Sequence, residues 1–223
     1  NPYSPFEVGR IEGGNSIWRD LKYWDRHVYI GTEADDGVKV VDVTDLDAPT
    51  LVYTITDVDN SHNIHIDADG YLYVVGADGH DIWIYDLTDP ANPVLTGTWD
   101  LQNGQTSTSG YCHDIEVYND KIYCASIYVG YFYIIDVQDK SNPYTLVTYN
   151  TGGGEISTHD CAITFDEQYL ITGDESLGGH IKIWDISNYN NINLVSEYYT
   201  PGWETHSAHN LYIQESNPDM LII

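Results

Sequence analysis

A five-residue apolar phrase that ends in aspartate occurs four times in this chain. The copies are Val38–Asp42, Ile82–Asp86, Phe132–Asp136 and Ile181–Asp185. Their aspartates lie 44, 50 and 49 residues apart. Short strands repeated with this period are typical of architectures in which each unit is a small antiparallel sheet. The repeat therefore limits the fold more strongly than any single motif does.

A second repeat, made of polar dipeptides, is interleaved with the first. Its copies are Arg19-Asp20, His62-Asn63, His113-Asp114, His159-Asp160 and His209-Asn210. Their second members are 43, 51, 46 and 50 residues apart, so the two series keep step. Each dipeptide opens an alternating stretch, which places it at one fixed position in every unit. A shared structural or chemical requirement put these residues there.

One complete unit can be read at residues 111–149. Its predicted strands are Tyr111–Tyr118, Lys121–Tyr128, Phe132–Val137 and Tyr144–Tyr149. Asn119-Asp120 has the residue types of a two-residue hairpin turn. No segment of the chain has a convincing helical period. The sequence therefore predicts an all-β protein, a β-propeller of four-stranded blades.

The repeats predict a single propeller domain over residues 1–223, of which the chain covers roughly five blades. The units fall approximately at 1–11 (partial), 15–56, 61–99, 111–149, 158–199 and 208–223 (partial). Residues 1–11 resemble 142–149, which predicts a fourth strand whose first three are missing. We expect the chain to be a piece of a longer protein.

The charge balance limits the partners. Eight Lys and Arg against 35 Asp and Glu give a formal charge of −27 and a pI near 4.1. This field repels nucleic acid and anionic membranes and attracts cations. No apolar run approaches the length of a transmembrane segment. We expect no nucleic-acid partner, and the acidity favours a location outside the cell.

Three cysteines are too few for a disulfide scaffold. A two-residue turn at Asn119-Asp120 pairs Cys124 with Ile115 and not with Cys112. Cys112 and Cys161 occupy equivalent ends of neighbouring units, so a bridge between those two is compatible with the repeat.

The apolar phrases, each followed by a turn rich in Thr, Asn, Asp and Pro, resemble LVIVD repeats. The resemblance narrows to the choice-of-anchor B family of bacterial secreted and cell-surface propellers. The residues that carry it are Asn15–Lys22, Ser61–Ile64, Cys112–Ile115, Thr158–Asp160, Thr164–Glu175 and Ala208–Leu211. Asp160 and Cys161 depart from the family pattern, which often has glutamine after the third histidine.

The resemblance implies about six blades in the full protein, with further blade structure beyond both ends of this chain. It also implies export and a C-terminal anchor that varies between members. It transfers no established activity.

Two interpretations of the histidines stand beside each other. In the structural one, a His at the start of an innermost strand hydrogen-bonds to the neighbouring blade, and the next Asp or Asn caps a turn or loop N–H. In the other, His62, His113, His159 and His209 hold a divalent transition metal, with Ca²⁺ a poorer fit to imidazole. A third interpretation, binding of a substrate without metal, uses the same polar ring. The other members of that ring are Arg19, Asp20, Asn63, Asp114, Asp160 and Asn210.

Three further sequence features have simpler structural explanations. His62 with His65, and His206 with His209, are three residues apart, which puts each pair on opposite faces of a strand. Asp67–Gly70 resembles the start of a calcium loop, but an Asp-Gly hairpin turn explains it better. The abundant Tyr and Trp residues fit blade packing as well as a carbohydrate-binding surface.

The first functional hypothesis is an exported, non-catalytic binding, adhesion or assembly module with a surface protein or glycan as partner. The rival is a metal-dependent lyase or hydrolase that acts on extracellular polysaccharide. In the rival, histidines hold the metal, Arg19 binds a substrate carboxylate and a nearby Asp is the base. A catalytic residue cannot be named from the sequence.

Overall fold

The computed structural model describes residues 3–101, 111–152, 157–214 and 221–222. Its contacts divide the chain into two compact units, Asn1–Gly97 and Thr98–Ile223.

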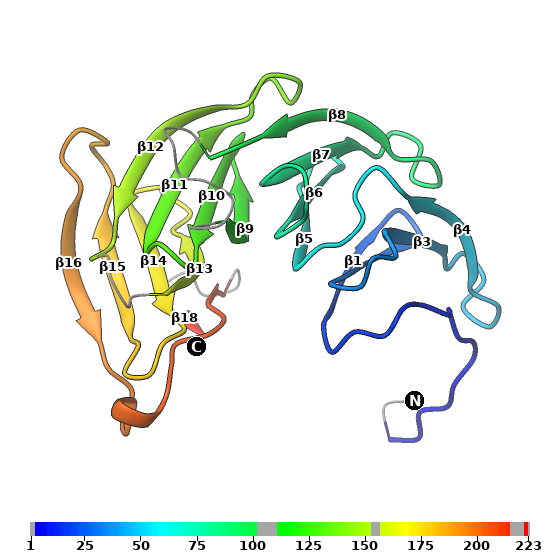
Figure 1. Cartoon of the computed structure of the whole chain (residues 1–223), viewed down its shortest axis with the longest axis horizontal. Helices are drawn as coiled ribbons and strands as arrows, with labels where there is room; N and C mark the ends of the chain where they lie inside the picture. Colours follow the sequence, from blue (N-terminus) through cyan, green and yellow to red (C-terminus); the bar gives the residue numbers. More distant parts are fainter. Residues whose placement is uncertain (1–2, 102–110, 153–156, 215–220, 223) are drawn as a thin grey trace. The chain divides into compact units, whose positions relative to one another are not determined.

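The described residues form four four-stranded antiparallel sheets, each with its strands in sequence order. Figure 1 shows these blades. The first blade contains β1 (Arg19–Trp24), β2 (His27–Thr32), β3 (Val38–Asp42) and β4 (Thr50–Ile55). The second contains β5 (Asn63–Ile66), β6 (Tyr71–Val75), β7 (Ile82–Asp86) and β8 (Val94–Trp99).

The third blade contains β9 (Cys112–Tyr118), β10 (Lys121–Ser126), β11 (Tyr131–Asp136) and β12 (Tyr144–Asn150). The fourth contains β13 (Thr158–Ile163), β14 (Tyr169–Asp174), β15 (Ile181–Asp185) and β16 (Asn193–Tyr198). A 3₁₀ turn (η1, Trp203–Thr205) then leads to a short pair, β17 (Tyr212–Ile213) with β18 (Leu221–Ile222). None of the helical segments in the described residues is long and apolar enough to cross a membrane.

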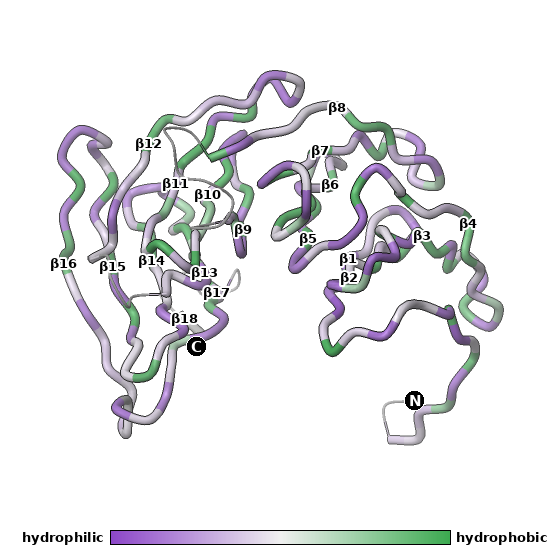
Figure 2. The backbone as a smooth tube through the Cα atoms, in the orientation of Figure 1, coloured by the Kyte–Doolittle hydropathy of each residue, from purple (hydrophilic) through white to green (hydrophobic). Residues whose placement is uncertain are grey.

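This architecture confirms the all-β propeller prediction. The repeated apolar phrases are the third strands β3, β7, β11 and β15, and most of the residues in these strands are buried. In the first unit, Tyr29, Val40 and Leu72 belong to one buried cluster that joins the two blades. In the second unit, Phe132 and Trp184 join the third and fourth blades in the same way. In Figure 2, hydrophobic (green) stretches lie in the middle strands β10 and β11, whereas the loop between β15 and β16 is hydrophilic (purple).

The N-terminal expectation was wrong for the described residues 3–11. They form no strand, although residues 1–11 resemble the fourth-strand segment at 142–149. A strand needs a hydrogen-bonded neighbour, and segment 3–18 belongs to none of the sheets. Part of its polar backbone is satisfied by a side chain, since the Gly14 N–H donates to Asp36 Oδ2 at 2.8 Å.

The hairpin in the third blade forms as predicted. Asn119 and Asp120 both have positive φ, as a two-residue type I′ turn requires, and Cys124 lies opposite Ile115. A β-bulge then changes the register: Ala125 faces Asp114, but Ser126 faces Cys112, so His113 is the extra residue of the bulge.

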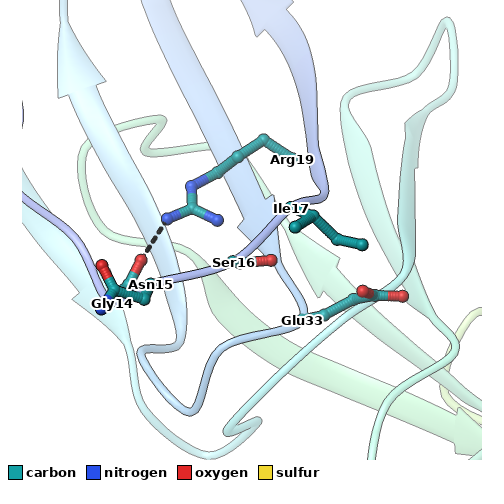
Figure 3. A pocket seen from close by; sticks show the side chains of 6 residues that line it. All are labelled: Gly14, Asn15, Ser16, Ile17, Arg19 and Glu33. Carbon is teal, nitrogen blue, oxygen red and sulfur yellow. Dashed lines mark hydrogen bonds between the residues drawn. The ribbon is translucent and has the colours of Figure 1, made fainter.

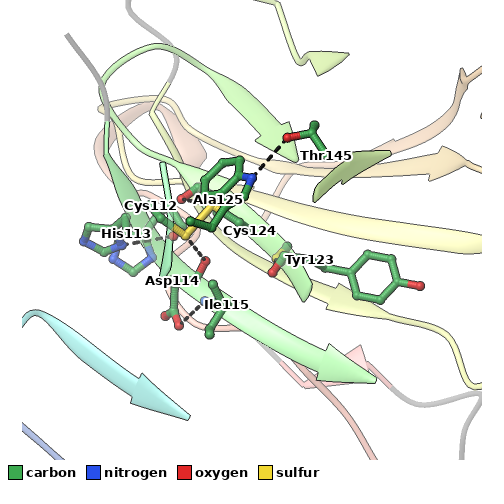
Figure 4. Close-up of a disulfide and its surroundings, with 11 residues drawn as sticks. Cys112, His113, Asp114, Ile115, Tyr123, Cys124, Ala125 and Thr145 are labelled. Atoms are coloured by element: carbon green, nitrogen blue, oxygen red, sulfur yellow. Dashed lines mark hydrogen bonds between the residues drawn. A yellow bond between two sulfur atoms is a disulfide. The ribbon is translucent and has the colours of Figure 1, made fainter. Parts of the chain in front are cut away.

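The bulge overturns the cysteine prediction. Because His113 is the extra residue, Cys112 moves to the same face of the blade as Cys124, and a disulfide joins the two. Figure 4 shows this bond, with His113 projecting away from it. Cys161 is buried and has a free thiol, so the bridge between Cys112 and Cys161 is not formed.

Candidate functional site

Both inner-strand histidines of the second unit lie at β-bulges. His159 repeats the geometry of His113: Thr158 faces Asp174 and Asp160 faces Gly173, which leaves His159 as the extra residue. Bulges re-aim side chains and are common next to functional sites. Strict alternation along a strand did not predict this arrangement.

The bulged histidines form a ladder of hydrogen bonds between blades. His113 Nδ1 lies 3.1 Å from the carbonyl oxygen of His159, and His159 Nδ1 lies 3.1 Å from that of His209. The ring centroids are 4.2 Å apart in the first pair and 4.0 Å in the second. A carbonyl only accepts, so Nδ1 carries the proton in both bonds. In a neutral imidazole, Nε2 is then the nitrogen with the lone pair.

The ladder brings His159 and His209 to a carboxylate that the sequence analysis did not select. Glu175 directly follows β14, and its Oε2 lies 3.6 Å from His159 Nε2. Its Oε1 lies 3.5 Å from His209 Nε2. Glu175 is the last residue of the acidic segment Thr164–Glu175, which is the only sequence signal for it. His113 adjoins this group through His159.

A polar pocket of about 540 Å³ begins at the same carboxylate. It is lined by Glu175, Ser176, Leu177, Thr205, His206 and Ser207. His206 and His209 were expected on opposite faces of a strand, but their segment precedes β17 and is not a strand. His206 therefore lines the pocket that begins at Glu175, a partner of His209.

Two of the three acidic members of the dipeptides, Asp20 and Asp160, bind backbone amides of the next blade. In the first unit, Asp20 Oδ2 accepts the Ile64 N–H at 3.0 Å. In the second, Asp160 Oδ2 accepts the Leu211 N–H at 2.6 Å. The expectation that these residues cap a turn or loop N–H was therefore wrong for Asp20, because Ile64 is a residue of strand β5. Asp114 accepts the N–H of Ile115, its own neighbour.

Two carboxyl groups of this inner region are perturbed by their surroundings. Burial raises the pKa of Asp160 to about 7, against the effect of its two backbone hydrogen bonds. Burial likewise raises the pKa of Glu116 to about 7, although its Oε2 accepts the Ile163 N–H at 2.9 Å. Burial also raises the pKa of the Cys161 thiol, which keeps it protonated and unreactive.

In the first unit, Arg19 lines a pocket of about 640 Å³ together with Gly14, Asn15, Ser16, Ile17 and Glu33. Its Nη2 donates to the Gly14 carbonyl at 2.5 Å, as Figure 3 shows. Its Nη1 donates to Thr32 Oγ1 at 2.6 Å and to the Trp18 carbonyl at 3.0 Å. Arg19 therefore organises the pocket wall, and much of its donor capacity is used by the protein itself.

His62 has a similar local role. Its Nδ1 lies 2.7 Å from Glu33 Oε1, and its ring stacks on Trp18 with a centroid distance of 4.9 Å. Asn63 opens β5 and is buried. The predicted ring is thus found as Arg19, Asp20, His62 and Asn63 in one unit. In the other unit it consists of His113, Asp114, His159, Asp160, His209 and Asn210, with Asn210 Oδ1 in contact with His209 Nδ1.

The weaker candidates have structural explanations. Asp67 Oδ1 accepts the N–H groups of Asp69 and Tyr71, and Asp67 Oδ2 accepts the Tyr73 hydroxyl. This carboxylate closes the Asp-Gly hairpin turn, with Gly70 at positive φ. Burial lowers the pKa of His65 to about 4, so it is a neutral residue packed against Tyr73.

Comparison with known proteins supports the fold. The LVIVD repeat model matches residues 62–100 and 109–151. None of the curated proteins matches the chain in sequence. A protein from Lactobacillus plantarum shares 13% identity with a TM-score of 0.59, over 77% of this chain and 54% of its own. The periplasmic gluconolactonase of Pseudomonas aeruginosa shares 9% sequence identity with a TM-score of 0.71. The match covers 94% of this chain and 65% of the gluconolactonase chain.

A putative 6-phosphogluconolactonase from Bacteroides fragilis is also similar, at 9% identity and a TM-score of 0.52, over 95% of this chain and 77% of its own. At these identities the likeness concerns the fold alone. The chain spans 54% and 65% of the first two structures. Fold and comparisons together define a β-propeller. More specifically, this propeller contains LVIVD repeats.

Proposed function

We propose that this chain belongs to an exported propeller of the choice-of-anchor B type that acts as a non-catalytic binding module at the cell surface. The observation that carries the proposal is the use of the repeated polar residues. Asp20 and Asp160 fasten one blade to the next, and Arg19 and His113 bind backbone carbonyls. Because these side chains are used in hydrogen bonds to the protein's own backbone, they stabilise the packing of the blades. Partners then bind to the pockets and loops that the blades position.

One further feature supports export, and a second one concerns the choice of partner. The disulfide between Cys112 and Cys124 belongs to an oxidising compartment. The formal charge of −27 keeps a tyrosine-rich surface soluble and disfavours nucleic acid as a partner.

The pocket at Arg19 is the candidate binding surface of the first unit. Its volume of about 640 Å³ lies within the range of small-molecule and sugar-sized sites. Its wall combines the fully exposed Ile17 with the hydrogen-bonded Arg19 and with Glu33. An apolar residue between polar groups suits a glycan or a surface-protein loop.

The test is binding of the purified chain to bacterial surface polysaccharides and envelope proteins, measured by biolayer interferometry with product analysis of the bound ligand. We expect saturable binding without cleavage, weakened at least tenfold by Ile17→Asp. Leu46→Asp is the matched control, because Leu46 is also an exposed aliphatic side chain of the first unit. Cleavage of the ligand, or equal effects of both variants, would contradict the proposal.

The alternative function, a metal-dependent lyase or hydrolase acting on extracellular polysaccharide, is favoured by one observation. His159, His209 and Glu175 converge beside a polar pocket. Two of the similar folds bear lactonase names, so a propeller of this kind is compatible with catalysis. Release of unsaturated or reducing ends from polysaccharide, abolished by Glu175→Gln, would support this function over the first.

A further inference from the structure

We propose that His159, His209 and Glu175 bind one divalent transition-metal ion of the zinc class. The proposal does not depend on the binding function above, because it concerns a separate group of residues in the second unit. One ligand atom from each of the three lies within 4.8 Å of the other two.

The first argument is the position of the imidazole protons. His159 donates from Nδ1 to the His209 carbonyl, and His209 donates from Nδ1 to the Asn210 side-chain oxygen. In a neutral ring, both Nε2 atoms then present lone pairs toward the Glu175 carboxylate. The two nitrogen lone pairs repel the negative carboxylate that they face. A cation placed between the two Nε2 atoms and the carboxylate attracts all three groups and removes this repulsion. A hydrogen bond from Nδ1 to an oxygen is also the usual support of a histidine that ligates metal through Nε2.

The second argument is distance. The Nε2–Oε distances of 3.6 and 3.5 Å exceed those of good N–H···O hydrogen bonds. Two ligand atoms about 2.0–2.1 Å from a shared zinc at the tetrahedral angle are about 3.3–3.4 Å apart. The separation therefore fits donors around an ion better than a direct pair. Direct pairs do occur elsewhere: His180 Nε2 lies 2.9 Å from Glu197, and His62 Nδ1 lies 2.7 Å from Glu33.

The third argument is rigidity and access. His159 is buried and held by the bulge and the ladder, whereas His209 and Glu175 are partly open to solvent. Glu175 also lines the pocket of about 540 Å³, so an ion at this position is reachable and keeps room for water or a ligand. Three protein donors with a further position open to water or a ligand are the arrangement of zinc sites that are not purely structural. The two nitrogens and one carboxylate select against Ca²⁺, which prefers six to eight oxygen donors.

The negative field of the protein adds to local attraction. Because the protein has 35 acidic and eight basic residues, it concentrates cations at its surface. This attraction is not specific for any one metal. Specificity must come from the imidazoles. The experiment therefore has to distinguish binding through imidazole nitrogens from non-specific attraction of cations to the acidic surface.

The experiment is titration of metal-free chain with Co²⁺, followed by visible absorption, and with Zn²⁺, followed by calorimetry. We expect one equivalent to bind and the Co²⁺ spectrum to report nitrogen ligation. Glu175→Gln and His209→Ala should each weaken binding at least tenfold. Both residues are partly exposed, so these variants preserve the fold better than His159→Ala does.

His180→Ala is the matched control, because His180 pairs directly with Glu197 in the same unit and should leave the affinity unchanged. Circular dichroism and the urea midpoint establish that each variant is folded. The proposal is overturned if folded wild-type chain binds no Co²⁺ with a ligand-field spectrum. It is also overturned if Glu175→Gln and His209→Ala bind as tightly as wild type, or if His180→Ala weakens binding equally.

Discussion

Single residues in this protein connect one blade to the next through backbone groups. Asp20 and Glu116 each accept an amide N–H from an inner strand of the neighbouring blade. Asp160 accepts the N–H of Leu211, the residue that precedes β17. His113 and His159 complement them by donating to carbonyls. Buried backbone groups need partners, and these side chains supply them where no sheet continues between blades. As a consequence, the carboxyl groups of Asp160 and Glu116 are held away from water.

That burial predicts a pH dependence of stability. The pKa of Glu116 is about 7 in the folded chain against 4.5 as its ordinary value, mainly because of burial. The folded state therefore keeps a proton that the unfolded state has released, and stability falls as pH rises from about 4.5 to 7. Glu116→Gln should flatten this decline by at most about 1.4 kcal/mol per pH unit.

The measurement is urea unfolding of wild type and Glu116→Gln at pH 5 and pH 7. Glutamine keeps an acceptor oxygen for the Ile163 N–H, so the variant should gain stability relative to wild type as pH rises. Glu12→Gln, at an exposed position, controls for the loss of one charge. An identical slope in the Glu116 and Glu12 variants would contradict the argument.

The residues of the candidate site were only partly predictable. The dipeptide repeat marked His159 and His209, because residues at one position of each blade recur in the sequence. Glu175 was missed because it follows the end of β14 and belongs to no repeat that we identified. The disulfide was missed because alternation assumes a regular ladder, and the bulge at His113 shifts Cys112 by one residue. Bulges depend on contacts between blades, which local sequence does not contain.

At the scale of elements, the repeated phrase ends in aspartate because the turn after each third strand needs an acceptor. Asp42, Asp86, Asp136 and Asp185 each accept the N–H two residues later, over 2.6–3.0 Å. A second acceptor three residues further on repeats the pattern; these residues are Asp45, Asp89, Asp139 and Asn188. These Asx turns fix the connection to the outer strand in all four blades. The strands and the Asn119-Asp120 hairpin were predictable because turn chemistry and alternation are local properties.

The Asx turns predict a difference between two substitutions at one position. Asp86→Ala removes the acceptor of the Thr88 N–H and should destabilise the chain by about 1 kcal/mol. Asp86→Asn retains an acceptor oxygen and should cost clearly less. Urea unfolding at neutral pH measures both. Equal losses in the two variants would show that the charge matters and that the hydrogen bond does not.

At the scale of the whole molecule, the excess of negative charge opposes folding by self-repulsion. Thirty-five acidic side chains face only eight basic ones. The ion pairs that do form are few among the described residues and include the buried pair of Lys182 with Asp174, 2.8 Å apart. Repulsion between exposed charges is screened over about 10 Å at 0.1 M salt and about 3 Å at 1 M, whereas a buried pair is screened much less.

Salt should therefore stabilise this protein. We expect the thermal midpoint to rise steadily between 20 mM and 500 mM NaCl, because screening relieves many repulsions and weakens only the few exposed attractions. KCl should act equally, and an uncharged osmolyte at matched osmolality should give a smaller rise. At pH 4.5, where carboxylates begin to protonate, the salt effect should shrink. A midpoint that is flat or falls with NaCl at pH 7 would mean that local ion pairs outweigh the net charge in setting the stability of the fold.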